Sequence, residues 1–366
     1  MRIAYVITTL GVGGAERQAL ALAERMAARG HAVSLIVLGR RVAEEWSTAL
    51  PVIRLSMRKS VLSLAAALAR ARRTLAEFHP DLVHSHSFHA NIFARMLHLF
   101  HPAPVLSTVH NVYEGGWLRM LAYRLTDGLS GGTAAVSSAV VERYVRLKAV
   151  PARKCVVMMN GIDTAAFAPY AERSQRIREA MGAAGEFIWI AAGRMAPAKD
   201  YPNLLRAFRR VMELRPAARL WIAGEPGDGA AAIRALATEL GVDEAIRWLG
   251  LRRDLPALLD AADAFVLASA WEGMPLVVGE AMAMEKPVAA TDVGGVRELC
   301  GACATIVSSR DADSLADAML ATMEKTQQER EELGRAARER IVRNFNMEAR
   351  ADAWEILYRK RISPEG

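Results

Sequence analysis

Short apolar runs alternate with helical patterns along nearly the whole chain, and this alternation constrains the fold more than any other feature of the sequence. Residues 2–8, 33–38 and 105–110 are apolar runs of strand length, and residues 15–29 and 61–78 have apolar positions at helical spacing. Strands that alternate with helices are typical of parallel sheets covered on both faces. The sequence therefore predicts an α/β protein in which ligands bind beyond the carboxyl ends of the strands.

The alternation continues to the C-terminus, with one interruption. Expected strands are residues 52–55, 81–84, 133–136, 156–158, 187–192, 220–223, 245–248, 264–267 and 287–290. Expected helices are residues 88–99, 117–125, 139–147, 203–212, 276–284, 314–323, 327–343 and 347–360. The pattern stops between Asn160 and Arg176, where turn residues and a polar, Pro-containing stretch indicate a linker. At 366 residues the chain is too long for one ordinary core, so two doubly wound domains are expected, at residues 1–166 and 167–345.

Charge is distributed unevenly between the two halves. Residues 1–170 carry 20 Lys and Arg against 10 Asp and Glu, whereas residues 171–366 carry 27 against 30. A basic half indicates an anionic partner, such as a membrane surface or a phosphorylated lipid. No nucleic-acid-binding motif is recognised, so we expect no nucleic-acid partner.

Two helical segments carry basic and apolar residues together. Residues 58–75 combine Leu and Val with four arginines and a lysine, and residues 115–125 read GGWLRMLAYRL. Both could lie on a bilayer interface. Each could equally pack its apolar side on the sheet and leave its arginines in solvent.

Cysteine usage and the N-terminus indicate the compartment. Only three cysteines occur, which favours a reducing environment over a disulfide framework. The first residues enter directly as a strand, with no pattern of a secretory signal, and no run reaches the length of a membrane-spanning helix. We expect a cytoplasmic protein, with peripheral membrane association left open.

The stretch from Ser269 to Gly295 contains two acids around a loop-to-helix junction. Glu272 lies in the loop, and Glu280 lies about one turn into the expected helix that follows Pro275. Unpaired amides at the start of that helix, with the helix dipole behind them, favour an anion or a sugar hydroxyl. Carboxylates beside such a site suggest hydroxyl recognition next to a diphosphate.

Other polar residues follow expected strands. Gly13 and Gly14 form a Gly-rich turn after the first strand, but the third glycine and the ribose-binding acid of a dinucleotide site are missing, which argues against a nicotinamide dehydrogenase. His86, His110 and Asn111 fall at strand ends.

The second half has its own polar residues after strands. Arg194 and Lys199 follow the strand at 187–192 and could clamp a diphosphate, with surface salt-bridging as the alternative. The loop around Leu251 could contact a base edge through its backbone.

Three groups superficially match metal sites. They are the histidines at 84, 86 and 89, Cys300 with Cys303, and Asp311 with Asp313. The histidines lack a fourth ligand nearby, the lone cysteine pair is a weak signal, and acids are common at the start of a helix. We expect no metal site.

The motifs together resemble the retaining glycosyltransferases of family 4, which have the GT-B architecture, and the resemblance spans nearly the whole chain. The most specific match is the two-glutamate motif at residues 272–283, and residues 193–199, 160–163 and 13–16 match in the same order. The resemblance implies two doubly wound domains that face a central cleft, with a last helix, residues 346–366, that packs back on the first domain. Met274 stands where relatives often carry Phe, which leaves the donor sugar open.

The resemblance also implies roles for individual residues. Arg194 and Lys199 would bind the donor diphosphate, Glu272 would approach the transferred sugar, and His110 would contact it; these four are the expected catalytic residues. Other donor-binding residues would be Gly13, Gly14, Gly193, Leu251, Gly273, Met274, Pro275, Leu276, Val277 and Glu280. On the acceptor side we expect His86, Asn111 and Arg119.

These roles predict transfer of a hexose from a nucleotide-diphosphate donor, with retention at the anomeric carbon. The donor is expected to be a UDP-sugar, because uracil is frequent in the family, and no cofactor or metal is expected. The preferred acceptor is a lipid-diphosphate-linked saccharide of cell-surface polysaccharide assembly, with a soluble acceptor as the alternative. Rival interpretations are a nucleotide-sugar epimerase on the same architecture and a two-lobed sugar-binding protein.

Overall fold

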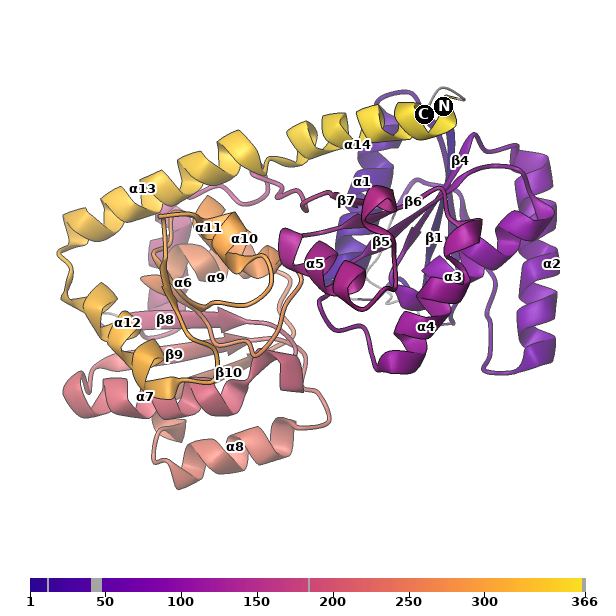
Figure 1. The fold of residues 1–366 in the computed structure, drawn as a ribbon. Helices are drawn as coiled ribbons and strands as arrows, with labels where there is room; N and C mark the ends of the chain where they lie inside the picture. The colour runs from indigo at the N-terminus through magenta and orange to yellow at the C-terminus, as the bar shows by residue number, and fades with distance from the viewer. Residues whose placement is uncertain (12, 41–47, 184, 364–366) are drawn as a thin grey trace. The chain divides into compact units, whose positions relative to one another are not determined.

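A computed structural model describes residues 1–11, 13–40, 48–183 and 185–363. The chain divides into two compact units (Figure 1). Unit 1 comprises Met1–Gly161 and Met347–Gly366, and unit 2 comprises Ile162–Asn346. The division falls a few residues before the boundary expected at 166, because Ile162 is buried against Gly279 and its amide donates to the carbonyl of Phe345.

Unit 1 is built on a seven-stranded sheet in the order β3-β2-β1-β4-β5-β6-β7. Every neighbouring pair is parallel. The strands are β1 (Arg2–Ile7), β2 (Ala32–Val37), β3 (Val52–Arg54), β4 (Leu82–His86), β5 (Val105–Val109), β6 (Gly132–Ala135) and β7 (Cys155–Val157). All carboxyl ends therefore meet at one edge of this sheet.

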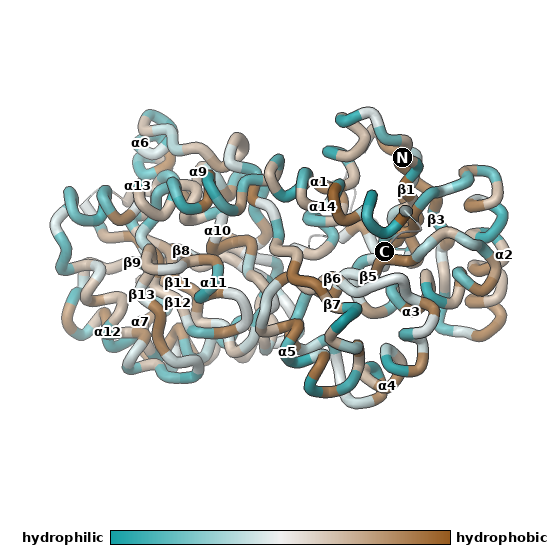
Figure 2. Tube along the Cα trace, turned by 45° about the horizontal axis from the view of Figure 1, so that its top comes forward, coloured by the Kyte–Doolittle hydropathy of each residue, from teal (hydrophilic) through white to brown (hydrophobic). Residues whose placement is uncertain are grey.

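Helices cover both faces of the first sheet. They are α1 (Gly14–Ala28), α2 (Val61–Phe78), α3 (Phe88–Leu97), α4 (Trp117–Leu125), α5 (Ser138–Arg146) and α14 (Met347–Ile362), with short 3-10 turns η1 (His98–Phe100), η2 (Asp127–Leu129) and η3 (Ala152–Lys154). Alternate residues of β1 contribute to two cores. Tyr5 lies in the core with α1 and α14, and Val6 lies in the core with α2 and α3. Figure 2 shows hydrophilic and hydrophobic residues alternating along α2, as expected for a helix with one packed face.

Unit 2 has a six-stranded parallel sheet in the order β10-β9-β8-β11-β12-β13. Its strands are β8 (Phe187–Ala192), β9 (Ala218–Ala223), β10 (Ile246–Gly250), β11 (Ala264–Leu267), β12 (Val288–Thr291) and β13 (Thr305–Val307). Its helices are α6 (Ala171–Ala180), α7 (Tyr201–Leu214), α8 (Ala230–Glu239), α9 (Leu255–Ala261), α10 (Leu276–Ala283), α11 (Val296–Cys300), α12 (Ala312–Glu324) and α13 (Gln327–Asn344), with 3-10 turns η4 (Pro197–Lys199) and η5 (Asp243–Ala245). The core between α7, α8, α12 and the sheet includes Trp189 and Phe208, both fully buried.

The expected linker is wrong in its second part, because residues 171–180 form α6. This helix buries none of its residues, so no apolar periodicity could reveal it. It is held by polar contacts instead. Arg173 pairs with Asp260, which is 6% exposed, and Nη1 of Arg178 donates to the carbonyl of Ala261 at 2.7 Å. Helix formation here follows from tertiary ion pairs.

Candidate active site

The carboxyl end of β8 in unit 2 presents an arginine. The strand ends at Ala192, Gly193 follows it, and the next residue, Arg194, is exposed. Among the described residues, Arg194 makes no ion pair and no side-chain hydrogen bond. Gly224, which follows the neighbouring β9, leaves room for the main chain at Gly193. A Cβ at position 224 would overlap the carbonyl of Gly193. The sequence analysis did not single out Gly224, since only the close approach of two strand ends gives this glycine its role.

Lys199 and Glu272 are brought together from positions 73 residues apart. Lys199 ends η4, and its Nζ lies 2.7 Å from Oε1 of Glu272. The same oxygen accepts a hydrogen bond from the Ser269 hydroxyl at 2.8 Å. The Thr291 hydroxyl donates in turn to the carbonyl of Ser269 at 2.7 Å. The carboxylate of Glu272 is therefore held in one orientation by a cation and a hydroxyl, and it is only 8% exposed. Ser269 and Thr291 belonged to the expected site stretch, but their sequence positions did not reveal these contacts.

The second acid lies on α10. This helix begins at Leu276 with Pro275 at its N-cap, one position earlier than the first-turn place expected for the proline. Glu280 is 3% exposed, and Met274 is 6% exposed. Leu276 and Val277, in the first turn, are partly exposed, so the amides of that turn lie near the surface of unit 2.

A turn after β12 packs closely on the loop that carries Glu272. Gly294 has φ +55°, and a Cβ there would overlap the carbonyl of Glu272. The amide of Gly295 donates to the carbonyl of Gly273 at 2.7 Å. Residue 294 therefore has to be glycine for the loop to keep its place. Leu251 follows β10 and is 39% exposed, at a strand end of the same sheet.

In unit 1, Gly13 is the N-cap of α1 and Gly14 is its first residue. Both are exposed. Glu16, in the first turn of this helix, accepts a hydrogen bond from the Thr9 hydroxyl at 3.2 Å. The Gly-rich turn therefore presents backbone rather than side chains at the carboxyl edge of the first sheet.

His86 and His110 are brought together at the ends of neighbouring strands. His86 is the last residue of β4, and His110 follows β5. Nδ1 of His86 lies 3.0 Å from Nε2 of His110. His86 is 2% exposed, whereas His110 is partly exposed. Burial lowers the pKa of His110 to about 4, so its imidazole is neutral near pH 7.

The other two residues expected on the acceptor side lie in the loop and helix that follow His110. Oδ1 of Asn111 accepts a hydrogen bond from the amide of Tyr113 at 3.1 Å. Arg119, on α4, donates to the carbonyl of Glu114 and lies 4.8 Å from the ring centre of Phe88. These contacts fix the loop between β5 and α4.

The residue groups that resembled metal sites have structural contacts. Asp311 is the N-cap of α12 and accepts a hydrogen bond from the amide of Ser314 at 2.9 Å. His84 is buried, whereas His89 is exposed on α3. Cys300 is buried, and Sγ of Cys303 lies 3.7 Å from the carbonyl of Ala336. Across the described ranges, no three His, Cys, Asp or Glu side chains form a group that could hold a metal ion.

Comparison with known proteins identifies the family. The model for glycosyltransferase family 4 matches residues 12–166, and the model for glycosyl transferases group 1 matches residues 174–340. A D-inositol 3-phosphate glycosyltransferase of Corynebacterium efficiens is 30% identical over 309 residues, which cover 78% of this chain and 72% of the relative. The chain belongs to glycosyltransferase family 4. It is a glycosyltransferase, as the sequence motifs predicted.

Further relatives agree with this assignment. A UDP-Gal:alpha-D-GlcNAc-diphosphoundecaprenol alpha-1,3-galactosyltransferase of Escherichia coli is 27% identical over 324 residues, covering 82% of this chain and 79% of the relative. Anabaena HepE, solved in complex with UDP and glucose, has a TM-score of 0.87 at 20% identity and covers 98% of this chain and 100% of that one. The predicted fold class, two doubly wound α/β domains of the GT-B type, is confirmed. The roles of individual residues remain predictions.

Proposed function

We propose that this glycosyltransferase moves a hexose from a UDP-sugar to the hydroxyl of a lipid-diphosphate-linked saccharide, with retention at the anomeric carbon. The observation that carries the proposal is the cluster in unit 2 of Arg194, which is exposed and has no ion pair with any residue the structure describes, the Lys199–Glu272 pair and the start of α10. A nucleotide diphosphate is the anion that such a set fits. The donor of the Escherichia coli relative is UDP-Gal, and HepE was solved with UDP, which supports the same base here.

The proposed chemistry assigns stabilisation of charge to this cluster. The bond between the anomeric carbon and the diphosphate oxygen breaks while the acceptor oxygen forms its bond on the same face of the sugar. The acceptor proton passes to the leaving phosphate oxygen. Arg194, Lys199 and the amides of α10 neutralise the charge that develops on the diphosphate. No metal is needed in this scheme, and no protein nucleophile is assigned.

Glu272 is suited to hold a sugar hydroxyl. Its carboxylate is fixed by Lys199 and Ser269. A carboxylate held in this way accepts hydrogen bonds in one direction. We propose that Glu272 orients the transferred sugar and that Glu280 binds the ribose hydroxyls.

The lipid-linked acceptor is supported by one surface of unit 1, which we call the α4–α5 surface. It comprises the exposed apolar residues Tyr113, Trp117, Leu118, Leu121, Leu125 and Leu147, together with Arg124, Arg143 and Lys148. Trp117 is 71% exposed and Leu125 is 75% exposed, although both are large and apolar. Contiguous apolar residues of this size on a surface mark an interaction site.

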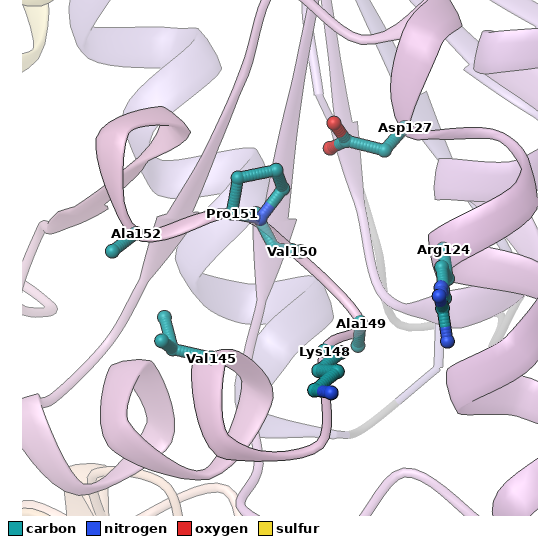
Figure 3. A pocket seen from close by; sticks show the side chains of 8 residues that line it. All are labelled: Arg124, Asp127, Val145, Lys148, Ala149, Val150, Pro151 and Ala152. Atoms are coloured by element: carbon teal, nitrogen blue, oxygen red, sulfur yellow. The ribbon is translucent and has the colours of Figure 1, made fainter.

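Two hollows interrupt the α4–α5 surface, and Arg124 lines both. The larger, of about 410 Å³, lies between Trp117, Leu121 and Leu147. The smaller, of about 240 Å³, is shown in Figure 3, where the labelled side chains of Arg124, Asp127, Lys148 and Pro151 lie around it. Apolar residues beside arginine and lysine suit an anionic bilayer interface. We propose that this surface holds the protein on the cytoplasmic face of a membrane. No helix in the described part of the chain is both long and apolar enough to cross a bilayer.

A panel of nucleotide sugars tests the reaction. The protein is incubated with each donor and with either a lipid-diphosphate-linked saccharide or its lipid-free saccharide, and products are detected by mass. We expect transfer from UDP-hexoses, with the lipid-linked acceptor preferred and an unchanged anomeric configuration by NMR. An inverted product refutes retention, and a preference for lipid-free saccharides favours the soluble acceptor. Conversion of the donor without any acceptor indicates an epimerase. Activity that persists after EDTA treatment supports metal independence.

A further inference from the structure

The rings of three histidines form a column in unit 1, and the reaction proposed above assigns them no role. The rings of His84 and His86 lie 4.1 Å apart, and those of His86 and His110 lie 5.2 Å apart. Tyr5 stacks on His86 at 6.0 Å. The column begins in the core beside Tyr358 of α14 and ends at His110, which is partly exposed.

Burial keeps these imidazoles neutral. It lowers the pKa of His84 and of His86 well below the usual value, and it lowers that of His110 to about 4. A neutral imidazole has one nitrogen that donates and one that accepts. The contact of 3.0 Å between Nδ1 of His86 and Nε2 of His110 therefore contains one proton, which belongs to one ring or to the other.

The surroundings of His86 distinguish the two arrangements. Nε2 of His86 is buried and has no hydrogen-bond partner among the described residues. If His110 donated to His86, the proton of His86 would lie on Nε2, as a buried N–H without an acceptor. Buried N–H groups without partners are rare. If His86 donates instead, only a lone pair stays without a partner, and the proton of His110 lies on Nδ1.

We propose that His86 is a positioning residue that fixes both the ring orientation and the tautomer of His110, so that His110 presents a protonated Nδ1 to the substrate. No described residue hydrogen-bonds to that nitrogen. A hydroxyl or phosphate oxygen of the donor is the acceptor that such an N–H fits. This part of the inference rests on the proposed function, whereas the tautomer itself does not.

The backbone of His110 is fixed independently by Glu114. The amide of His110 donates to Oε1 of Glu114 at 3.1 Å, and the Tyr123 hydroxyl donates to Oε2 at 2.9 Å. Nδ2 of Asn91 donates to the Tyr123 hydroxyl, also at 2.9 Å. Glu114 therefore holds the main chain of His110, and His86 holds its ring. Whether Nδ1 of His110 carries the proton depends on the hydrogen bond with His86.

Nitrogen NMR of the full-length protein tests the tautomer without any substrate. Histidine is labelled with ¹⁵N, and the signal of His110 is assigned by its loss in His110→Asn. We expect Nδ1 to be protonated and Nε2 to be bare. A protonated Nε2 on His110 overturns the proposal.

Two substitutions of His86 test its positioning role. Phe keeps a ring beside Tyr5 and His84 but cannot donate, whereas the side-chain amide of Asn can place a donor where Nδ1 of His86 lies. We expect His86→Phe to show a mixture of His110 tautomers. We also expect kcat to fall by about 10-fold or more, because His110 then orients the donor less well. We expect His86→Asn to keep the wild-type tautomer and most of the turnover, with the KM for the donor little changed in both variants.

His98→Phe is the matched control, because His98 lies in the same unit and its Nδ1 lies 3.1 Å from the nearby carbonyl of Ala103. It should leave the turnover and the signal of His110 unchanged. Equal turnover in His86→Phe and wild type contradicts the positioning role, as does an unchanged tautomer in that variant. If the wild-type protein transfers no sugar, the proposed function fails, but the NMR result still decides the tautomer.

Discussion

Arg194 and Lys199 were both predicted to bind a diphosphate, but their surroundings differ. Lys199 is paired with Glu272, whose side chain is 11% exposed, whereas Arg194 is exposed and pairs with no described residue. Removing Lys199 leaves a largely buried carboxylate without its cation, and removing Arg194 leaves no such charge. The structure therefore separates two residues that the sequence treated alike.

Arg194→Ala and Lys199→Ala should each lower kcat/KM by roughly 100-fold, because each removes a donor to the developing diphosphate charge. Only Lys199→Ala should also lower the free energy of unfolding, by about 1–3 kcal/mol. Steady-state kinetics and denaturant unfolding check the two effects. Arg206→Ala, an exposed arginine on α7, is the control and should change neither. Near-normal transfer by both variants would show that Arg194 and Lys199 do not stabilise the diphosphate during the reaction.

At the scale of elements, α2 and α4 both combine apolar residues with arginine in sequence, and the structure distinguishes their packing. The helix α2 buries Ala67, Ala71 and Leu75 in the core with α3, although Val61 and Leu62 at its start are exposed. The shorter α4 buries only Met120 and Tyr123. The packing interpretation therefore holds for the body of α2, whereas the bilayer interpretation of α4 stays a prediction. The body of α2 packs on its own sheet, and α4 keeps an apolar side exposed.

The double variant Trp117→Ser with Leu118→Ser should abolish sedimentation with anionic vesicles, because it removes two large apolar residues from the α4–α5 surface. Arg124→Ser should weaken binding by about 1 kcal/mol and reduce its salt dependence. Leu214→Ser, at an exposed leucine of unit 2, is the control for lost apolar area. Turnover of a lipid-free acceptor should be unchanged in all three. Undiminished sedimentation of the double variant would contradict a membrane role for this surface.

At the scale of the whole molecule, unit 1 is completed by the last helix of the chain. Trp354 and Tyr358 of α14 are buried in the core with β1 and α1. The Tyr358 hydroxyl lies 2.9 Å from that of Tyr5 and 2.7 Å from Nδ1 of His84. Ion pairs between Arg29 and three acids of α14, Glu348, Asp352 and Glu355, add contacts at the surface. The histidine column is therefore supported by residues more than 270 positions away.

Tyr358→Ala should lower the free energy of unfolding of unit 1 by about 3–5 kcal/mol, because it removes a buried aromatic ring. Tyr358→Phe should cost about 1–3 kcal/mol, because it leaves buried polar partners unsatisfied. Ile356→Ala, on the same helix but 69% exposed, should change stability by less than about 0.5 kcal/mol. Denaturant unfolding followed by hydrogen exchange checks this order. A small effect of Tyr358→Ala would show that α14 does not stabilise the core.

Acid should destabilise unit 1 selectively. Burial lowers the pKa of His110 from 6.5 to about 4 and lowers those of His84 and His86 in the same direction. The unfolded chain therefore binds more protons than the folded chain over this window, and the free energy of unfolding falls as the pH drops from about 6.5 toward 4. The raised pKa of Glu114 acts in the opposite direction, but the lowered pKa values of His31, His89 and His101 add to those of the three column histidines, which makes six groups against one.

Hydrogen exchange of β4 and β5 at pH 7 and pH 5 checks this expectation. Unit 2 is an internal control, since all eight histidines of the chain lie in unit 1. Equal loss of protection in the two units would contradict the histidine origin.

The sequence by itself determined the fold class and the family, because both depend on local patterns. Strand and helix periodicity need only neighbouring residues, and the motif around Glu272 and Glu280 is contiguous. Most strands and helices accordingly lie within a few residues of their expected ranges. The expected ranges omit β13 and α11, which are three and five residues long, and α6, which has no buried face to leave a pattern.

Only the tertiary structure decided which site residues touch. The contacts of Lys199 with Glu272, of His86 with His110 and of Tyr358 with His84 join residues 73, 24 and 274 positions apart. No local pattern encodes such pairs, because they depend on the order of strands in each sheet. The same holds for burial. The sequence placed His86 at a strand end, and the packing of β4 beside β1 and β5 decided that its ring is buried and contacts another histidine rather than solvent.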